Sequence, residues 1–338
     1  MLLSINIPTY NRAHFLKKNL NILIHQILSL GVRDNVEINI SDNASTDDTN
    51  NVVLEIIKSY PTISIHYSAN DKNYGGEVNL ITAMHMANGE YSLLLGDDDF
   101  LKEDGLGLIF RYLKQFDYIP MFLFNRTDVA SDGKYLREKV FLRDIDKQEV
   151  FDFSLFKEGK LFFSLATTLG GVLSFTSSVL YKTSILKEIG KFDERFYGTY
   201  YPFHYYWWGY LLKGKKLMYV NDSFLNCTVG TYNDDLGSDK VNRKMVDFGG
   251  FNKIAKMLFK DTPYYSDYIS SPFKDADPFD LIYLYCYDTK NYLDRLLPYL
   301  KEAGWSEKYT NKFISRFSIL GLLKLTIRSL ISYLKNKR

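Results

Sequence analysis

The sequence has few cysteines and no long apolar segment. Only two of its 338 residues are cysteines, Cys227 and Cys286, and neither belongs to a Cys-x-x-Cys or Cys/His spacing. Neither a zinc site nor a disulfide framework is therefore indicated. No run approaches the roughly 18 uninterrupted apolar residues that mark a membrane span. The opening MLLSINIPTYNR has no basic region and reaches Pro8 before an apolar run develops, so we expect no signal peptide and a cytoplasmic protein.

A strong excess of one charge is also missing. Lysine and arginine number 42 against 40 acidic residues, which gives a formal net charge of +2. The chain therefore has no overall electrostatic footprint for nucleic acid, and no such partner is predicted. Apolar residues make up 46% of the sequence, which excludes a disordered protein, and the aromatic share of 16% is high.

The first hundred residues alternate between strand-like and helix-like patterns. Short β-rich runs begin near Leu3, Val36, Ile63 and Tyr91, and each interval holds apolar residues spaced three and four apart. Such a βαβα series predicts an α/β fold with a parallel sheet covered by helices on both faces. Ligands of these sheets bind at the carboxyl ends of the strands.

Helix ends can be placed from local signals. The first helical segment should stop at Gly31. The second should start at STDD, with Ser45 and Asp48 as a capping pair, and end before Pro61. Later strand-like runs are IPMFLFN, GGVLSF and LMYVN, and the pattern after Gly237 is helical.

Polar groups gather where the predicted strands end. The fourth strand runs straight into GDDD, the first is followed by PTYNR, and the second by SDNASTDD. The PTYNR loop lacks the G-x-G-x-x-G pattern, which disfavours a nicotinamide or flavin enzyme. Asp42 and Asn43 can exchange hydrogen bonds with a planar base, whereas turn and cap chemistry explains Ser45 and Asp48 better.

Taken together, the motifs resemble those of the inverting nucleotide-sugar glycosyltransferases of GT-A fold, family 2. The similarity rests on IPTYNR, ISDNASTDDT, NYGGEVN and GEYSLLLGDDDFL, in order and spacing, over about the first 105 residues. It continues more faintly from SILKEIGKFDERF to LKGKKLMYV. In GTYYP and GGVLS the chain looks most like the bacterial O-antigen subgroup that includes abequosyltransferases.

The resemblance implies a GT-A (Rossmann-like), mostly parallel sheet flanked by helices, with a C-terminal helical appendage. It implies a catalytic domain over residues 1–230, with a nucleotide-sugar half (1–105) and an acceptor half (106–230), followed by a helical region (231–338). The implied function is transfer of a hexose from a nucleoside-diphosphate sugar to a lipid-linked surface-polysaccharide precursor. The residues of the motifs quoted above would carry out this transfer.

The resemblance also implies roles for single residues. Contacts with the nucleotide-sugar donor fall to Pro8, Thr9, Tyr10, Arg12, Asp42, Asn43, Asn73, Asn79 and Asp97, although loop capping explains Asn73 and Asn79 almost as well. Asp98 would be the direct ligand of a Mg²⁺ or Mn²⁺ ion on the diphosphate, with Asp99 beside it or turned toward the sugar.

Three positions depart from the family's pattern. Gly96 stands where the Asp-x-Asp-Asp motif begins, and Val78 stands where many members carry an arginine beside the diphosphate. Pro202 and Phe203 occupy the place of the Glu-Asp pair that supplies the catalytic base. The neighbouring His204 is the expected base, because its unperturbed pKa is near 6.5, and Asp193 and Glu194 are alternatives.

Two segments allow two interpretations each. Phe196 to Tyr210 holds ten aromatic residues among fifteen, which either stack on a sugar poor in hydroxyls, such as a deoxy or dideoxy hexose, or pack in the core. The tail from Tyr309 to Arg338 carries seven basic and no acidic residues. It forms either a basic amphipathic helix on the inner face of the cell membrane or a helix packed on the enzyme with a solvated basic edge.

Two other functions remain open from the residues. A sugar nucleotidyltransferase shares the parallel sheet and acidic ligands, but it usually needs a glycine-rich and basic loop after the first strand, which PTYNR does not supply. A catalytically silent sugar-nucleotide or glycan binder is compatible with the missing Glu-Asp pair.

Overall fold

The structure is a computed structural model that describes residues 1–229 and 240–274. Its main sheet has eight strands in the order β3-β2-β1-β4-β10-β6-β11-β9. In that order the strands are Ser64–Ala69, Val36–Asp42, Leu3–Thr9, Tyr91–Leu94, Val179–Lys182, Met121–Phe124, Lys216–Val220 and Gln148–Asp152. Strands β3, β2, β1 and β4 are parallel, and β10 runs antiparallel to β4 and β6. The expected α/β architecture is confirmed, with a parallel half and a mixed half.

A second sheet has the order β5-β12-β7-β8. Its strands are Asp99–Leu101, Leu225–Thr228, Arg126–Val129 and Tyr135–Lys139. Because β5 begins at the last aspartate of GDDD and pairs with β12, with Asp99 opposite Cys227, this sheet fixes the carboxyl end of the motif.

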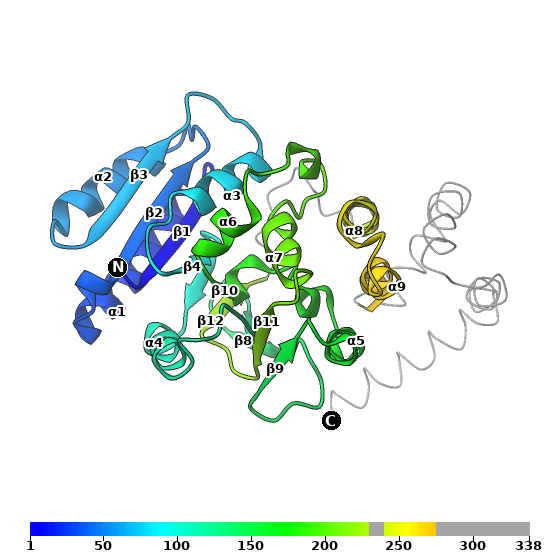
Figure 1. Cartoon of the computed structure of the whole chain (residues 1–338). Coiled ribbons are helices and arrows are strands. Elements are labelled where there is room, and N and C mark those ends of the chain that lie inside the picture. Colours follow the sequence, from blue (N-terminus) through cyan, green and yellow to red (C-terminus); the bar gives the residue numbers. More distant parts are fainter. Residues whose placement is uncertain (230–239, 275–338) are drawn as a thin grey trace, which may run out of the picture.

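Helices cover both faces of the main sheet (Figure 1). They are α1 (Ala13–Leu30), α2 (Thr49–Ser59), α3 (Gly76–His85), α4 (Gly105–Gln115), α5 (Phe156–Leu165), α6 (Ser184–Ile189), α7 (His204–Leu211), α8 (Lys240–Ile254) and α9 (Tyr265–Ile269). Short turns of 3₁₀ helix lie at Arg33–Asn35, Leu169–Val172, Thr176–Ser178, Glu194–Phe196 and Ser271–Lys274, and a π-helical turn follows α8 at Ala255–Phe259. Figure 1 places α8 and α9 next to α5 and α7, far from β3. No helix within the described ranges is long and apolar enough to span a bilayer.

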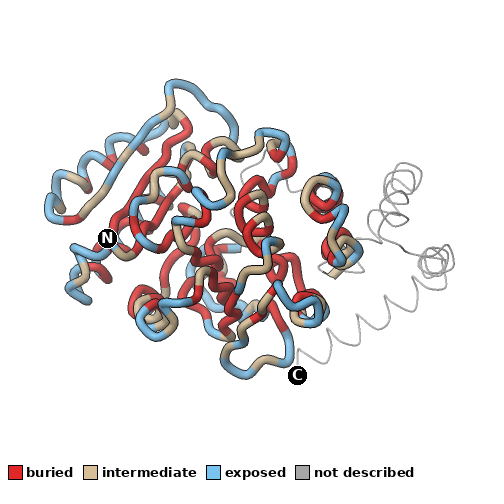
Figure 2. Tube along the Cα trace, viewed as in Figure 1, coloured by how far each residue is buried: buried red, intermediate tan, exposed pale blue. Residues whose placement is uncertain are grey.

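The core consists of two clusters, one on each face of the sheet. Strand β6 shows the division, because Met121 and Leu123 belong to the cluster under α3, α5 and α7, whereas Phe122 and Phe124 belong to the cluster under α1, α2 and α4. This alternation is the period of two that a strand buried on both faces requires. Figure 2 shows the buried central strands between helices with exposed outer surfaces.

Most of the expected elements are present, with two corrections. Helix α1 ends at Gly31, whose φ of 66° is the left-handed cap that glycine favours. The expected Ser45/Asp48 cap of α2 is wrong, because the carboxylate of Asp47 accepts the backbone N–H of Thr49 instead. The run GGVLSF is not a strand, since it turns through the 3₁₀ helix Leu169–Val172. The basic tail, 309–338, lies outside the described residues.

Candidate active site

A cavity of about 380 Å³ opens at the carboxyl ends of β1, β2 and β4. Four loops and the start of α3 contribute its wall. The lining residues are Pro8, Thr9, Tyr10, Arg12, Asn43, Asn73, Gly75, Gly76, Asn79, Leu80, Gly96, Asp97 and Asp98. Four motifs distant in the sequence thus meet at one edge of the sheet, as the parallel topology requires.

Arg12 joins the first loop to the aspartate motif. Its Nη1 lies 2.8 Å from Oδ1 of Asp97, and its Nη2 lies 2.8 Å from Oδ2 of Asp98. Thr9 donates its hydroxyl to the other oxygen of Asp97 at 2.8 Å. Burial raises the pKa of Asp97 to about 7, against the opposing effect of Arg12. Asp98 is the more accessible of the two, with 21% of its side chain exposed against 4% for Asp97.

Asp99 points into the protein rather than into the cavity. Its Oδ2 accepts the hydroxyl of Ser177 at 2.5 Å, and the same hydroxyl accepts the backbone N–H of Gly96 at 2.9 Å. Burial and the neighbouring Asp98 raise the pKa of Asp99 to about 6. Asn19 of α1 donates to the carbonyl oxygens of Gly96 and Asp99. The expected ligand role of Asp99 therefore has no geometric support, since this residue holds the motif in place from behind.

The acidic residues of the cavity suit a divalent cation in part. Asp97 and Asp98 supply the hard oxygen donors that Mg²⁺ and Mn²⁺ prefer. Within the described ranges, no group of three His, Cys, Asp or Glu side chains is arranged so that it could hold a metal ion. An ion held here would need further oxygens from a bound ligand. Its charge would offset the repulsion from Asp98, which adds to burial in raising the pKa of Asp97 and Asp99.

An amide network shapes the side of the cavity formed by Asn43 and Asn73. Asn43 donates to Asn73 at 2.7 Å and accepts from the side chain of Asn70 and the backbone of Tyr74. Asn73 in turn accepts the N–H of Gly75. Both asparagines line the cavity. They brace the loop before α3, and they can also contact a ligand.

Asp42 and Asn79 have different positions. Asp42 does not line the cavity, because one oxygen accepts from the backbone and hydroxyl of Ser45 and the other accepts from Tyr67 at 2.7 Å. Asn79 does line it, and it also ties α3 to the carbonyl oxygen of Thr9 at 3.2 Å and to Ser41.

Helix α3 begins at the cavity with two glycines. A Cβ atom built on Gly75 or Gly76 would have no neighbour within 4 Å, so the space before the helix is open. Gly75 has a φ of 91°, a conformation that a residue with a side chain rarely adopts. The first-turn N–H groups of a helix lack partners within the helix and attract anions.

His204 lies in the hydrophobic core and not at the cavity. Its side chain is fully buried, with Nδ1 2.6 Å from the hydroxyl of Tyr268 and Nε2 3.1 Å from the carbonyl oxygen of Leu173. Burial lowers its pKa to about 3. The expectation that His204 is the base is therefore not supported, because a buried neutral imidazole with both nitrogens engaged cannot reach a substrate.

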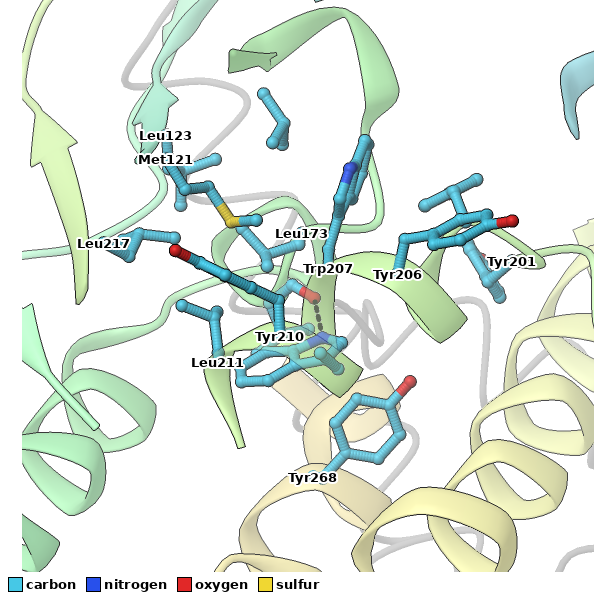
Figure 3. Packing of buried hydrophobic residues seen from close by; sticks show 14 of the residues in the cluster. Met121, Leu123, Leu173, Tyr201, Tyr206, Trp207, Tyr210, Leu211, Leu217 and Tyr268 are labelled. Atoms are coloured by element: carbon cyan, nitrogen blue, oxygen red, sulfur yellow. Dashed lines mark hydrogen bonds between the residues drawn. The ribbon is translucent and has the colours of Figure 1, made fainter. Parts of the chain in front are cut away.

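The aromatic segment around His204 is mainly a packing element. Its buried rings belong to the cluster shown in Figure 3, where Tyr206 and Trp207 project from α7 into the same cluster as Tyr201 and as Tyr268 of α9. Tyr200 differs, because 42% of it is exposed. Core packing thus accounts for most of these rings.

One acidic residue near the cavity was not singled out from the sequence. Glu77, in the first turn of α3, accepts the backbone N–H of Gly198 at 2.6 Å and that of Tyr200 at 2.5 Å. It lies between the lining residues Gly76 and Asn79 in the sequence. Its partners are 121 and 123 positions away, and no sequence signal marks a contact with backbone N–H groups.

Comparison with known proteins places this site in context. The family model "Glycosyl transferase family 2" matches residues 4–176. Abequosyltransferase RfbV of Salmonella typhimurium is 31% identical over 262 residues, which is 77% of this chain and 76% of that protein. A GalNAc(5)-diNAcBac-PP-undecaprenol beta-1,3-glucosyltransferase of Campylobacter jejuni is 28% identical over 58% of this chain and 56% of its own length.

Two solved structures share the fold at low sequence identity. S. aureus TarS 1–349 in complex with UDP-GlcNAc has a TM-score of 0.60 and 14% identity, over 90% of this chain and 82% of that one. The mannosyltransferase PcManGT from Pyrobaculum calidifontis, in complex with GDP-Man and Mn²⁺, has a TM-score of 0.52 and 15% identity, over 95% and 86%. The GT-A architecture expected from the motifs is thereby confirmed.

Proposed function

The chain belongs to glycosyl transferase family 2, and from this premise we propose that it transfers a hexose from a nucleoside-diphosphate sugar to a lipid-linked surface-polysaccharide precursor, with inversion at the sugar. The observation that carries the proposal is the cavity itself. It brings the loop after β1, the amide network after β2, the open start of α3 and the aspartates after β4 to one edge of the sheet.

Asp98 and Asp97 are the residues that would hold a divalent cation. Asp98 is the better placed, because it is more exposed to the cavity. A bound Mg²⁺ or Mn²⁺ would supply positive charge to the diphosphate as the leaving group departs. The naming of Mn²⁺ in the structure of a fold neighbour agrees with this choice.

Two further groups in the cavity can meet the negative charge of the diphosphate. Arg12 presents its guanidinium between the two aspartates, and α3 directs its first-turn N–H groups at the open space before Gly75 and Gly76. Together they can bind the diphosphate at a site where the family pattern would place an arginine at Val78. The bracing of Asn43 and Asn73 leaves room for the nucleotide between them and Pro8.

The names of two relatives support the proposed donor and acceptor classes. The S. typhimurium relative is named for transfer of abequose, a dideoxy hexose, and the C. jejuni relative is named for an undecaprenol-linked acceptor. We infer the same classes here: a hexose poor in hydroxyls as the donor sugar, and a lipid-linked oligosaccharide at the membrane surface as the acceptor. Binding without turnover is the alternative, because the family's Glu-Asp pair is absent.

Substitution of Asp98 tests the proposal. Asp98→Asn should lower the rate of sugar transfer, measured with a panel of nucleoside-diphosphate sugars and a lipid-linked acceptor in Mn²⁺, by on the order of 10²–10³-fold. The matched control is Asp104→Asn, because Asp104 also pairs with an arginine at 2.8 Å but on the exposed surface. Transfer at the wild-type rate by Asp98→Asn would remove the assigned site, and a wild-type protein that binds nucleotide without transfer would favour the binder.

A further inference from the structure

The cavity lacks an evident group to accept the proton of the acceptor hydroxyl. Among its lining residues in the described part of the chain, the acidic ones are Asp97 and Asp98, and both are held by Arg12. His204 is buried in the core. Asp193 binds the guanidinium of Arg195 through both carboxylate oxygens. A base drawn from the described residues near the cavity would therefore stand beside its lining rather than within it.

Glu77 occupies such a position. Residues 76, 79 and 80 of α3 line the cavity. Because successive helical residues are about 100° apart, Glu77 lies next to the side of α3 that carries Gly76 and Leu80. Its side chain is half-buried, so it keeps some exposure to solvent. The carboxylate lies between the cavity-lining start of α3 and the loop 198–200, to which both of its oxygens are bound.

The loop that holds Glu77 is built for this contact. Gly198 and Tyr200 both adopt positive φ, 77° and 64°, and both direct their N–H groups at the carboxylate. A tyrosine in this conformation stores strain, which persists only where the surroundings impose it. The loop is also supported from behind, because Lys253 of α8 donates to the carbonyl oxygen of Tyr197 at 2.8 Å.

The same loop leads directly to the position of the missing pair. Tyr200 is two residues before Pro202, where the resemblance to the family would place the Glu-Asp pair. The carboxylate of Glu77 is bound to the N–H of Tyr200, in the segment that leads into this position. Each oxygen accepts one N–H bond and keeps a second lone pair. That lone pair is available to a hydroxyl in the cavity.

We propose that Glu77 is the general base of the transfer, replacing the absent Glu-Asp pair from a different element of the fold. The inference rests on the proposed function. The carboxylate takes the proton of the acceptor hydroxyl while the acceptor oxygen bonds to the anomeric carbon. The bond between that carbon and the diphosphate oxygen breaks, and its electron pair leaves with the nucleoside diphosphate. The partly exposed Glu77 then returns the proton to water.

Glu77→Gln is the direct test. The amide keeps the size of the side chain but cannot take the proton, so kcat should fall on the order of 10²–10⁴-fold. The dissociation constant of the nucleoside diphosphate and the KM of the acceptor should stay within a few-fold of wild type. The matched control is Glu158→Gln, because Glu158 also lies in the first turn of a helix and accepts a backbone N–H, that of Asp152, at 2.6 Å. Its kcat should not change.

A second variant separates catalysis from support of the loop. In Glu77→Ala, added formate should restore part of the transfer rate, because a small carboxylate can enter the space left by the side chain. Loss of activity through a raised acceptor KM or a lower melting temperature, with no rescue by formate, would overturn the assignment of Glu77 as the base. Glu77 would then only hold the loop 198–200 in place. If Glu77→Gln transferred the sugar at the wild-type rate, only this inference would be overturned. A wild-type chain without transfer activity would overturn the proposed function and the base with it.

Discussion

Three consecutive aspartates have three different environments in this protein. Two unit charges 4 Å apart repel by about 4 kcal/mol at the dielectric of a protein surface. The structure places the three carboxylates in different surroundings. Asp97 binds Arg12 and Thr9, Asp98 faces the cavity, and Asp99 binds Ser177. The raised pKa values of Asp97 and Asp99 have burial as their first cause and Asp98 as a contributor. A cation at Asp98 would relieve that repulsion.

His204 gives a prediction about stability rather than catalysis. Burial lowers its folded-state pKa to about 3, whereas the unfolded chain has a pKa near 6.5. Its contribution is thus complete above pH 6.5 and is lost as the pH falls toward 3, because only the unfolded state takes up the proton. Between pH 7.5 and pH 5, the free energy of unfolding should drop by about 2 kcal/mol more in wild type than in His204→Gln.

Urea unfolding at the two pH values measures this difference. Glutamine keeps a donor and an acceptor for Leu173 and Tyr268 but does not titrate. All other titrating groups are common to both proteins and cancel in the comparison. Equal losses in wild type and variant would mean that the imidazole is accessible in the folded state, and a role for His204 at the substrate would have to be reconsidered.

At the scale of elements, the first half of the fold was accessible from the sequence because each element carries its own periodicity. The second half was less so. The run GGVLSF looks like a strand, but Leu173 has a φ of 68°. A Cβ on Gly171 would also lie 2.6 Å from the carbonyl oxygen of Phe141. This close backbone approach explains both the glycine and the turn, and it depends on a contact distant in the sequence.

The cavity itself was predictable to a similar extent. Its lining was found because parallel strands bring their carboxyl ends to one edge, whatever the details of the loops. The roles of the single acidic residues were not predictable. Only the fold turns Asp99 toward Ser177 and Asp42 toward Tyr67. Glu77 was missed because its partners are backbone N–H groups of a distant loop.

Helix α8 provides a prediction at this scale. A Cβ on Gly250 would lie 2.0 Å from the carbonyl oxygen of Thr199, in the loop that holds Glu77. Gly250→Ala should therefore lower the free energy of unfolding by about 1–3 kcal/mol, and it should reduce kcat by displacing that loop. Gly209→Ala in α7 is the control, because its new Cβ would meet only ordinary contacts at 3.7 Å to Ile189.

Urea unfolding and transfer assays on both variants check the prediction. Gly209→Ala should be neutral or stabilise the protein by about 0.5–1 kcal/mol, as alanine does in a helix interior. A Gly250→Ala variant as stable and as active as wild type would show that α8 does not press on the 198–200 loop.

For the whole molecule, helix α3 connects the cavity with the loop before α7. The cavity lining comes from the parallel part of the main sheet, built by β1 to β4, and Glu77 of α3 binds the loop before α7, whose aromatic residues pack in the cluster under α3, α5 and α7. Ligands that bind to the cavity should therefore stabilise the folded chain as one unit. The size of the effect follows from ligand concentration and affinity.

The last prediction concerns the coupling of metal and nucleotide. If Asp98 and the diphosphate share one ion, each ligand should raise the affinity of the other by the same factor. The protein's melting temperature should then rise more with Mn²⁺ and one nucleoside diphosphate together than the sum of their separate shifts. At a nucleotide concentration 100 times its dissociation constant, stabilisation should be about 2.7 kcal/mol.

Asp98→Asn should lose the excess over additivity while keeping a shift with nucleotide alone, and Asp104→Asn should behave as wild type. Purely additive shifts across UDP, GDP, CDP and dTDP would mean that Arg12 and the start of α3 meet the diphosphate without a metal ion.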